Sequence, residues 1–381
     1  MASEKTRRWT AQIVGGLFVT IIGPILVAVL MKYLDRPETP AVGEVPATGA
    51  AAGPTTAEST AAAKTAPDGG PAYAVAPFDA AQARAHQEAW AKHLGITVET
   101  DNALGMKLVL VPPGEFIMGA TPEEIEAELE HVTRPNVQGR IRGSGPQHPV
   151  TLTKPFYCAA SEVTVGQFRR FTEATGKRTD AEQDAEAEHT WKNPGYPLSD
   201  DLPVTCVSWR DAVAFCDWLS DQEHFARANL ATTRPAGYRL PTEAEWEFAC
   251  RAGTTTPSAA GAGKLDEYGW FRTNSDLQAQ PVAGKRANAF GLHDMHGNAS
   301  EWCRDWYAES YYALPILRDP SDPEEGSWRV YRGGSFHVIP AAGRSAARYH
   351  ALPNVHLPAS GFRVVRDVKP ASKEGVPGRG T

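Results

Sequence analysis

The feature that most limits how this chain can fold is a run of 19 residues, 13–31, without a charged side chain. As a helix with a rise of about 1.5 Å per residue, it spans roughly the ~30 Å hydrocarbon core of a bilayer. The residues after it, Lys32, Tyr33 and Leu34, offer no small-residue cleavage site of the kind a secretory signal has. A buried core helix is the alternative, but the run lies near the N-terminus and precedes a low-complexity segment. The sequence therefore predicts one transmembrane helix at 13–31, after a short N-terminal segment, 1–12.

Basic residues around this run indicate its orientation. Three precede it, Lys5, Arg7 and Arg8, and two follow it, Lys32 and Arg36. Because Lys and Arg are enriched on the cytoplasmic side, the bias of three to two predicts a cytoplasmic N-terminus. We therefore expect a single-pass membrane protein whose large domain lies outside the cytoplasm.

The rest of the chain divides by composition. Residues 32–76 are dominated by Ala, Pro, Thr and Gly, which cannot bury enough apolar surface to offset ordering entropy, so they are expected to form a disordered linker. Residues 77–100 predict a short helix and connector, in which Asp79 can cap the helix and Gly95 can end it. Residues 101–368 are expected to form the folded domain, followed by a disordered tail at 369–381. The net charge of −7, without a block of Lys or Arg, argues against a nucleic-acid partner.

Local patterns predict an α+β domain. Residues 107–111 predict a strand, 112–114 a turn, and the residues through Met118 a second strand, so a hairpin is expected. Residues 165–175 and 209–222 have the apolar spacing of amphipathic helices. Short segments rich in Gly, Asn, Ser and Pro follow in the last third of the chain, so the fold is expected to be irregular and rich in loops.

A further helix is predicted to begin at Thr242, which forms a capping-box pattern with Glu245. Glu243 and Glu247 are interpreted as partners of nearby arginines in ion pairs, with a catalytic role as the alternative. Five cysteines lie in the chain without a Cys-x-x-Cys pair, so most are interpreted as small buried hydrophobic residues.

Several segments occur in the order found in one family. They are 105–119 (GMKLVLVPPGEFIMG), 162–164 (EVT), 203–204 (PV), 207–209 (VSW), 238–247 (YRLPTEAEWE), 291–302 (GLHDMHGNASEW), 329–338 (RVYRGGSFHV) and 361–364 (GFRV). Together they resemble the formylglycine-generating enzymes, or sulfatase-modifying factors, which oxidise a sulfatase cysteine to formylglycine. The resemblance runs from about Gly105 to Arg366, and it implies the family's irregular α+β fold, related to C-type lectins.

The resemblance also implies a calcium site. Asp294 and Glu301 match its carboxylate ligands, and Gly297 and Ala299 match the residues that supply backbone carbonyls. Calcium prefers such oxygen ligands. The alternative is a turn rich in Asn and Gly that binds no ion.

The redox centre of the family is altered. Its two copper-binding cysteines correspond to Val338 and Gly343, and no cysteine follows Cys303, so copper is not expected. Ser335, which matches the serine beside the oxygen pocket, is retained, whereas Ser300 replaces the usual tryptophan. Arg348 matches an arginine near the substrate groove, although an ion pair within the fold explains it equally well.

A different metal chemistry is one alternative to the copper pair. Histidines in this region could hold a different metal: His293, His296, His337, His350 and His356. No Gly-x-Ser-x-Gly elbow supports a nucleophilic triad.

The leading hypothesis is thus a membrane-anchored binding or accessory domain that binds a protein, peptide or glycan and lacks cysteine-to-formylglycine oxidase activity. The alternative is an oxidative enzyme of the family that uses a variant metal centre. Missing thiols favour the first hypothesis, and Ser335 favours the second.

Overall fold

The computed structural model describes residues 69–130, 132–133, 135–227, 237–261, 264–313, 318–320 and 323–368. The predicted N-terminal segment, the membrane span at 13–31, most of the linker and the tail lie outside these residues. Within the described part of the chain, no helix is both long enough and apolar enough to cross a membrane. The membrane helix therefore stays a prediction.

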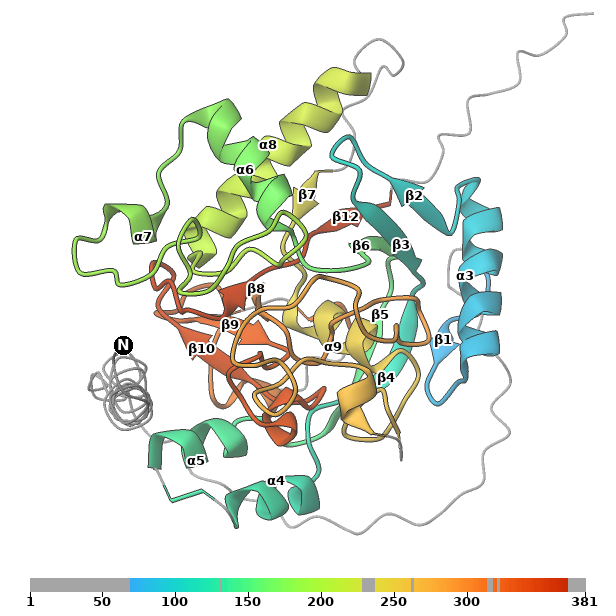
Figure 1. The fold of residues 1–381 in the computed structure, drawn as a ribbon. Coiled ribbons are helices and arrows are strands. Elements are labelled where there is room, and N and C mark those ends of the chain that lie inside the picture. The colour runs from blue at the N-terminus through green and yellow to red at the C-terminus, as the bar shows by residue number, and fades with distance from the viewer. Residues whose placement is uncertain are drawn as a thin grey trace, which may run out of the picture. The chain divides into compact units, whose positions relative to one another are not determined.

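A five-stranded antiparallel sheet lies beside helices α3 and α8 (Figure 1). Its strands, in spatial order, are β2 (Glu99–Asp101), β3 (Lys107–Val111), β6 (Phe156–Ala159), β12 (Val365–Asp367) and β7 (Tyr238–Arg239). The sheet joins the beginning of the domain to its end, because β3 and β12 both pair with β6.

Two smaller sheets complete the strand structure of the described residues. One has the order β1 (Ala74–Val75), β4 (Gly114–Met118) and β5 (His148–Leu152). The other has the order β10 (Tyr349–Ala351), β9 (Arg329–Arg332), β8 (Ser300–Trp306) and β11 (Ser360–Gly361). β8 begins directly after the segment 291–299, and β9 ends directly before the segment 333–338.

The predicted helices form where their capping signals lie. The α-helices are α3 (Ala80–Leu94), α4 (Pro122–Leu129), α5 (Pro135–Arg142), α6 (Val165–Thr175), α7 (Asp180–Gln183), α8 (Trp209–Arg227) and α9 (Glu243–Arg251). Asp79 caps α3 and Gly95 ends it in a left-handed conformation. Thr242 caps α9 through a complete capping box with Glu245, as predicted. Short 3₁₀ helices lie at Leu265–Glu267, Tyr311–Ala313 and Pro340–Gly343.

The predicted hairpin of β3 and β4 is wrong. Both strands exist, but β3 pairs with β2 and β6, whereas β4 pairs with β1 and β5 in a different sheet. Both edges of β3 are thus occupied by other strands. Pro112 and Pro113 lack the amide hydrogens that a hairpin ladder needs beside its turn, and the chain passes there from one sheet to the next.

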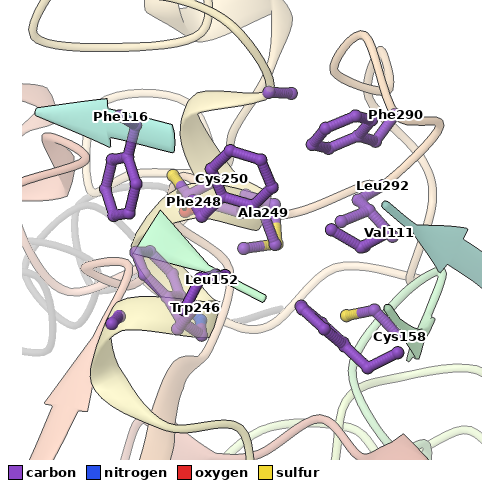
Figure 2. Packing of buried hydrophobic residues seen from close by; sticks show 14 of the residues in the cluster. Val111, Phe116, Leu152, Cys158, Trp246, Phe248, Ala249, Cys250, Phe290 and Leu292 are labelled. Carbon is purple, nitrogen blue, oxygen red and sulfur yellow. Dashed lines mark hydrogen bonds between the residues drawn. The ribbon is translucent and has the colours of Figure 1, made fainter. Parts of the chain in front are cut away.

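Helix α9 lies at the centre of the hydrophobic core. Trp246, Phe248 and Cys250 of this helix pack among side chains from several sheets and loops, including Val111, Phe116, Leu152, Cys158, Phe290 and Leu292 (Figure 2). Trp246 and Phe248 are each 1% exposed. α9 is therefore a buried element of the core, and the loops near β8 and β9 lie beside it.

The same helix carries buried charges. Glu247 accepts hydrogen bonds from Arg251 Nε at 2.8 Å and the Gly119 amide at 2.9 Å, and also from Arg332 Nη2. Glu243 pairs with Arg348 at 2.7 Å. These contacts confirm that both glutamates are partners in ion pairs. The prediction of nearby arginines holds for Glu247 with Arg251, whereas Glu243 pairs with the distant Arg348 and Arg239 pairs with Glu245.

Candidate functional site

The loop before β8 has a strained backbone. Asp294, Gly297 and Asn298 have φ angles of 57°, 93° and 54°, in the left-handed region. A Cβ atom on residue 297 would lie 2.3 Å from the Trp270 carbonyl oxygen, so only glycine fits this close approach. The bend turns Asp294 into the domain, where it is 1% exposed.

Glu301 of β8 is held by two donors. Arg363 forms a two-pronged pair with it, since Nε and Nη2 donate to its two carboxylate oxygens at 2.6 Å each. The Trp246 indole donates to Oε2 at 2.7 Å. Glu301 and Arg363 are both 0% exposed. The charge of this predicted calcium ligand is therefore already balanced by a guanidinium.

Asp294 lies beside Glu162, a carboxylate for which no role was predicted. Glu162 Oε1 accepts the Ala299 amide at 3.2 Å, and Asp294 Oδ2 accepts the Ala283 amide at 2.6 Å. The other oxygen of each carboxylate, Glu162 Oε2 and Asp294 Oδ1, is buried without a hydrogen-bond partner. Burial, followed by the nearby charge of Asp294, raises the pKa of Glu162 well above its usual range, and burial also raises the pKa of Asp294.

The donor set suits a hard cation such as calcium, because every available side-chain atom here is an oxygen. Among the described residues, no group of three or more His, Cys, Asp or Glu side chains is placed to hold a metal ion. Calcium would thus need backbone carbonyls beside the two carboxylates, and Gly297 and Ala299 were predicted to supply them. Calcium binding stays a prediction.

An aromatic ring fills the space beside Gly343, one of the two positions that were predicted to match the family's cysteines. A Cβ atom on Gly343 would lie 2.6 Å from Cε1 and 3.1 Å from Cζ of Phe271, which is 0% exposed. Val338 is half-buried, and its carbonyl accepts the Arg272 amide at 2.9 Å. A second thiol therefore has no room at position 343 unless Phe271 moves.

The two serines of this region bond within the loop. Ser300 Oγ donates to the Gly334 carbonyl at 2.8 Å, and Ser335 Oγ accepts the His337 amide at 3.3 Å. Both side chains are largely buried, at 7% and 3% exposed. They fix the shape of the Gly333–Gly334–Ser335 turn.

Arg348 forms an ion pair within the fold. Its guanidinium pairs with Glu243 through Nε and Nη2 at 2.7 and 2.8 Å, and Nη1 donates to the Gly143 carbonyl at 2.9 Å. The residue is 2% exposed and lies over the ring of Tyr312. Its donors are thus directed into the fold and not toward a ligand.

Burial disfavours deprotonation of all five cysteine thiols. All five are free and buried. Burial raises the pKa of Cys158, Cys206 and Cys250 to about 12 each, and it also raises the pKa of Cys216 and Cys303. Copper(I) binds the thiolate form, and burial disfavours that form at each of these residues.

The histidines have separate partners. His293 Nδ1 lies 2.8 Å from the Lys285 carbonyl, and His356 lies 3.2 Å from Asp184. His296 Nδ1 donates to the Gly343 carbonyl at 2.7 Å while Nε2 accepts the Ala259 amide at 3.0 Å, an arrangement of a neutral ring. Burial lowers the pKa of His296 to about 4.

The two remaining histidines contact aromatic rings. His350 stacks on Tyr307, with ring centroids 3.9 Å apart, and His337 lies edge-on against Phe336 at 4.3 Å. The five histidines considered from the sequence are therefore not the ligands of one shared centre.

Sequence reasoning missed Glu162 and Phe271. Glu162 stands in the segment 162–164 that contributed to the family resemblance, but its distance in sequence from Asp294 concealed their contact. Nothing in the sequence around Phe271 indicates that its ring reaches Gly343.

Comparison with known proteins places this geometry in a family. Formylglycine-generating enzyme from Streptomyces coelicolor is 32% identical over 310 residues, covering 68% of this chain and 88% of that protein. Chaperone protein LppX from Paenibacillus barcinonensis is 29% identical over 217 residues, which are 46% of this chain and 73% of that protein. The solved structure of PvdO from Pseudomonas aeruginosa has a TM-score of 0.58 and 26% identity, covering 71% of this chain and 98% of that one.

The family model described as "Sulfatase-modifying factor enzyme 1-like domain" matches residues 96–368. This match spans well over half of the chain and contains every loop of the candidate site. The protein therefore belongs to the sulfatase-modifying factor family, which also includes the formylglycine-generating enzymes.

Proposed function

We propose that this chain is a membrane-anchored binding or accessory domain of the sulfatase-modifying factor family that does not oxidise cysteine to formylglycine. The observation that carries the proposal is the packing of Phe271 against Gly343. The family's centre needs two thiolates on this loop, and here one position is an aliphatic side chain and the other a glycine whose side-chain space is filled. The loop keeps its shape without the chemistry.

The surface of the same loops supports a binding role. Leu277 and Ile339 are both 48% exposed. Their two loops are linked by the hydrogen bond from the Arg272 amide to the Val338 carbonyl. Exposed apolar side chains on linked loops favour a protein or peptide ligand over a glycan. The similarity to a protein named as a chaperone also supports an accessory role.

The proposed tether is the run at 13–31, with the domain outside the cytoplasm. Full-length protein should sediment with membranes and stay there after a carbonate wash, and protease added to spheroplasts should degrade the domain. Intact protein in the soluble fraction would remove the membrane-anchored part of the proposal.

The lack of oxidase activity is tested on a sulfatase-derived peptide that contains the target cysteine. The full-length chain, purified in detergent, is incubated with the peptide with and without added copper, and the peptide is analysed by mass spectrometry. The Streptomyces coelicolor enzyme serves as the positive control. We expect no formylglycine from this chain, whereas catalytic formation of formylglycine would support the alternative, an oxidase with a variant metal centre.

A further inference from the structure

Residues 121–143 leave the core of the domain and return to it at one point. The Ala120 amide donates to the Ser144 carbonyl at 2.8 Å, and both residues are 0% exposed. Gly119, one residue earlier, is tied to α9, because its amide donates to Glu247 at 2.9 Å. The segment therefore begins and ends at a narrow neck that is fixed to the core.

The helices α4 and α5 of this segment are only loosely packed on the domain. No residue of α4 is buried, and neither is any α5 side chain at 137–142. The two helices pack on each other at one edge of the domain (Figure 1). Ile125 of α4 reaches back to Gly145, where a Cβ atom would lie 2.8 Å from its Cδ1. Elements with so little buried apolar surface open at low cost while the core stays folded.

An ion pair ties α4 to the domain. Nε and Nη2 of Arg344 donate to the two carboxylate oxygens of Glu128, and Nη1 lies 3.8 Å from Glu124. The Arg344 and Glu128 side chains are 9% and 16% exposed, so water screens this pair much less than an ion pair on the open surface. Arg344 directly follows Gly343. The pair therefore joins α4 to the loop at 333–347.

The end of α5 is tied to the same region. The carbonyl of Gly143, the residue directly after α5, accepts a hydrogen bond from Arg348 at 2.9 Å. A Cβ atom on Gly143 would lie 2.6 Å from the Tyr307 hydroxyl. Since Arg348 directly precedes β10, this tie lies where that strand begins.

An aromatic pair lies beside the two helices. Tyr349 of β10 stacks on Tyr331 of β9 with ring centroids 5.3 Å apart, and Tyr331 is buried. The charges that act on the Tyr349 phenol include those of Glu128 and Arg344, and the charge of Arg140 in α5 acts on both tyrosines. The two helices and their ion pair therefore surround this aromatic pair.

We propose that α4 and α5 form a lid beside the loop at 333–347, with the pair of Glu128 and Arg344 as its latch and the neck as its hinge. When the latch opens, both charged groups gain water in place of each other, so the open form is within thermal reach. The lid then moves about the neck and uncovers the aromatic pair. Aromatic rings are favoured contacts for a protein or peptide, so the opened lid enlarges the binding surface, a step that rests on the proposed function.

Hydrogen–deuterium exchange of the full-length chain in detergent, followed by mass spectrometry, measures this local opening. Glu128→Gln removes the charge of the latch at nearly constant size, and Arg344→Lys keeps the charge but loses the two-pronged geometry. Glu126→Gln is the matched control, because Glu126 lies on the same helix and is exposed. Each protein is also mixed with the dye anilinonaphthalene sulfonate, which reports exposed apolar and aromatic surface.

In the wild type, the amides of α4 and α5 should exchange together and faster than those of β8 and β9. Glu128→Gln should speed their exchange by roughly tenfold or more, because hydrogen bonds between charged groups are lost. Arg344→Lys should speed it less. The Ala120 amide and the strands should keep their wild-type exchange, and Glu126→Gln should match the wild type throughout. Dye fluorescence should rise with Glu128→Gln and not with Glu126→Gln.

Exchange in α4 and α5 that is as slow as in β8 and β9 would remove the lid. Equal exchange of α4 in Glu128→Gln and Glu126→Gln would remove the latch. If Glu128→Gln also speeds exchange in β8 and β9, it destabilises the whole domain, and Arg344→Lys then decides: exchange of α4 unchanged from the wild type overturns the latch. Faster exchange without a rise in dye fluorescence would overturn the link to ligand binding, while the proposed lack of oxidase activity is tested separately on the peptide.

Discussion

The packing of Phe271 against Gly343 gives a measurable prediction about the loop that contains Gly343. Gly343 has no left-handed φ angle, so alanine suits its backbone conformation, but the new Cβ atom would stand 2.6 Å from Phe271 Cε1. Neither partner yields easily. The Phe271 ring is 0% exposed, and the Gly343 carbonyl is held by His296 at 2.7 Å. We therefore expect Gly343→Ala to destabilise the native state by about 1–3 kcal/mol, the usual cost of overpacking.

A double-mutant cycle isolates this contact. Phe271→Ala alone should cost about 3–5 kcal/mol, because it leaves a cavity. In that background, Gly343→Ala should cost little, so the two effects should fall short of additivity by roughly 1 kcal/mol or more. Gly139→Ala is the control, since nothing lies within 4 Å of a Cβ atom at that helical position, and it should be neutral or slightly stabilising.

Urea denaturation of the four proteins measures these values. Strict additivity of Gly343→Ala and Phe271→Ala would refute the reasoning, because it would mean that the ring does not occupy the space of the lost side chain. The same steric argument predicts that Val338→Cys with Gly343→Cys gains no copper(I) site while Phe271 is present. Copper binding by that double variant would equally contradict it.

Two further predictions concern buried charge and pH. Glu247→Ala should cost about 3–5 kcal/mol in urea denaturation, because it leaves Arg251 and Arg332 buried without their shared carboxylate. The exposed control Glu99→Ala should change stability by less than about 1 kcal/mol. Burial lowers the pKa of His350 to about 3, so the folded state stays neutral while the unfolded state takes up a proton below its ordinary value of 6.5. Stability should thus fall as pH drops below 6.5. His350→Phe keeps the stack on Tyr307 and should remove up to roughly 1.4 kcal/mol per pH unit of that loss. Equal slopes of unfolding free energy against pH for the two proteins would contradict this role.

The sequence was sufficient for elements whose signals are local. The caps at Asp79 and Thr242 and the stop at Gly95 are set by hydrogen bonds within a few residues, so the helices they bound were predicted closely. The partners with which β3 and β4 pair are not determined by neighbouring residues. It depended on which other strands occupy the edges of β3, and the turn at Pro112 gave a misleading hairpin signal.

The same distinction applies to the candidate site. Asp294 and Gly297 were found because they lie in one short segment with a familiar pattern. Glu162 was not, since its contact with this loop crosses 137 residues of chain. The partner of Glu301 could not be predicted either, because the pairing of Arg363 with it depends on how β8 and the C-terminal segment meet.

The buried network around α9 explains how the loop at 333–347 is held. Arg332 stands directly before Gly333, at the start of the loop, and its guanidinium donates to the carbonyls of Ser345, Ala346 and Ala347 at its end, at 2.9 to 3.1 Å. Glu247 of α9 holds that guanidinium in place. Both ends of the loop are therefore fastened to the core by groups outside positions 338 and 343. Since neither closing contact involves a thiol, these contacts hold both ends of the loop without a cysteine at position 338 or 343.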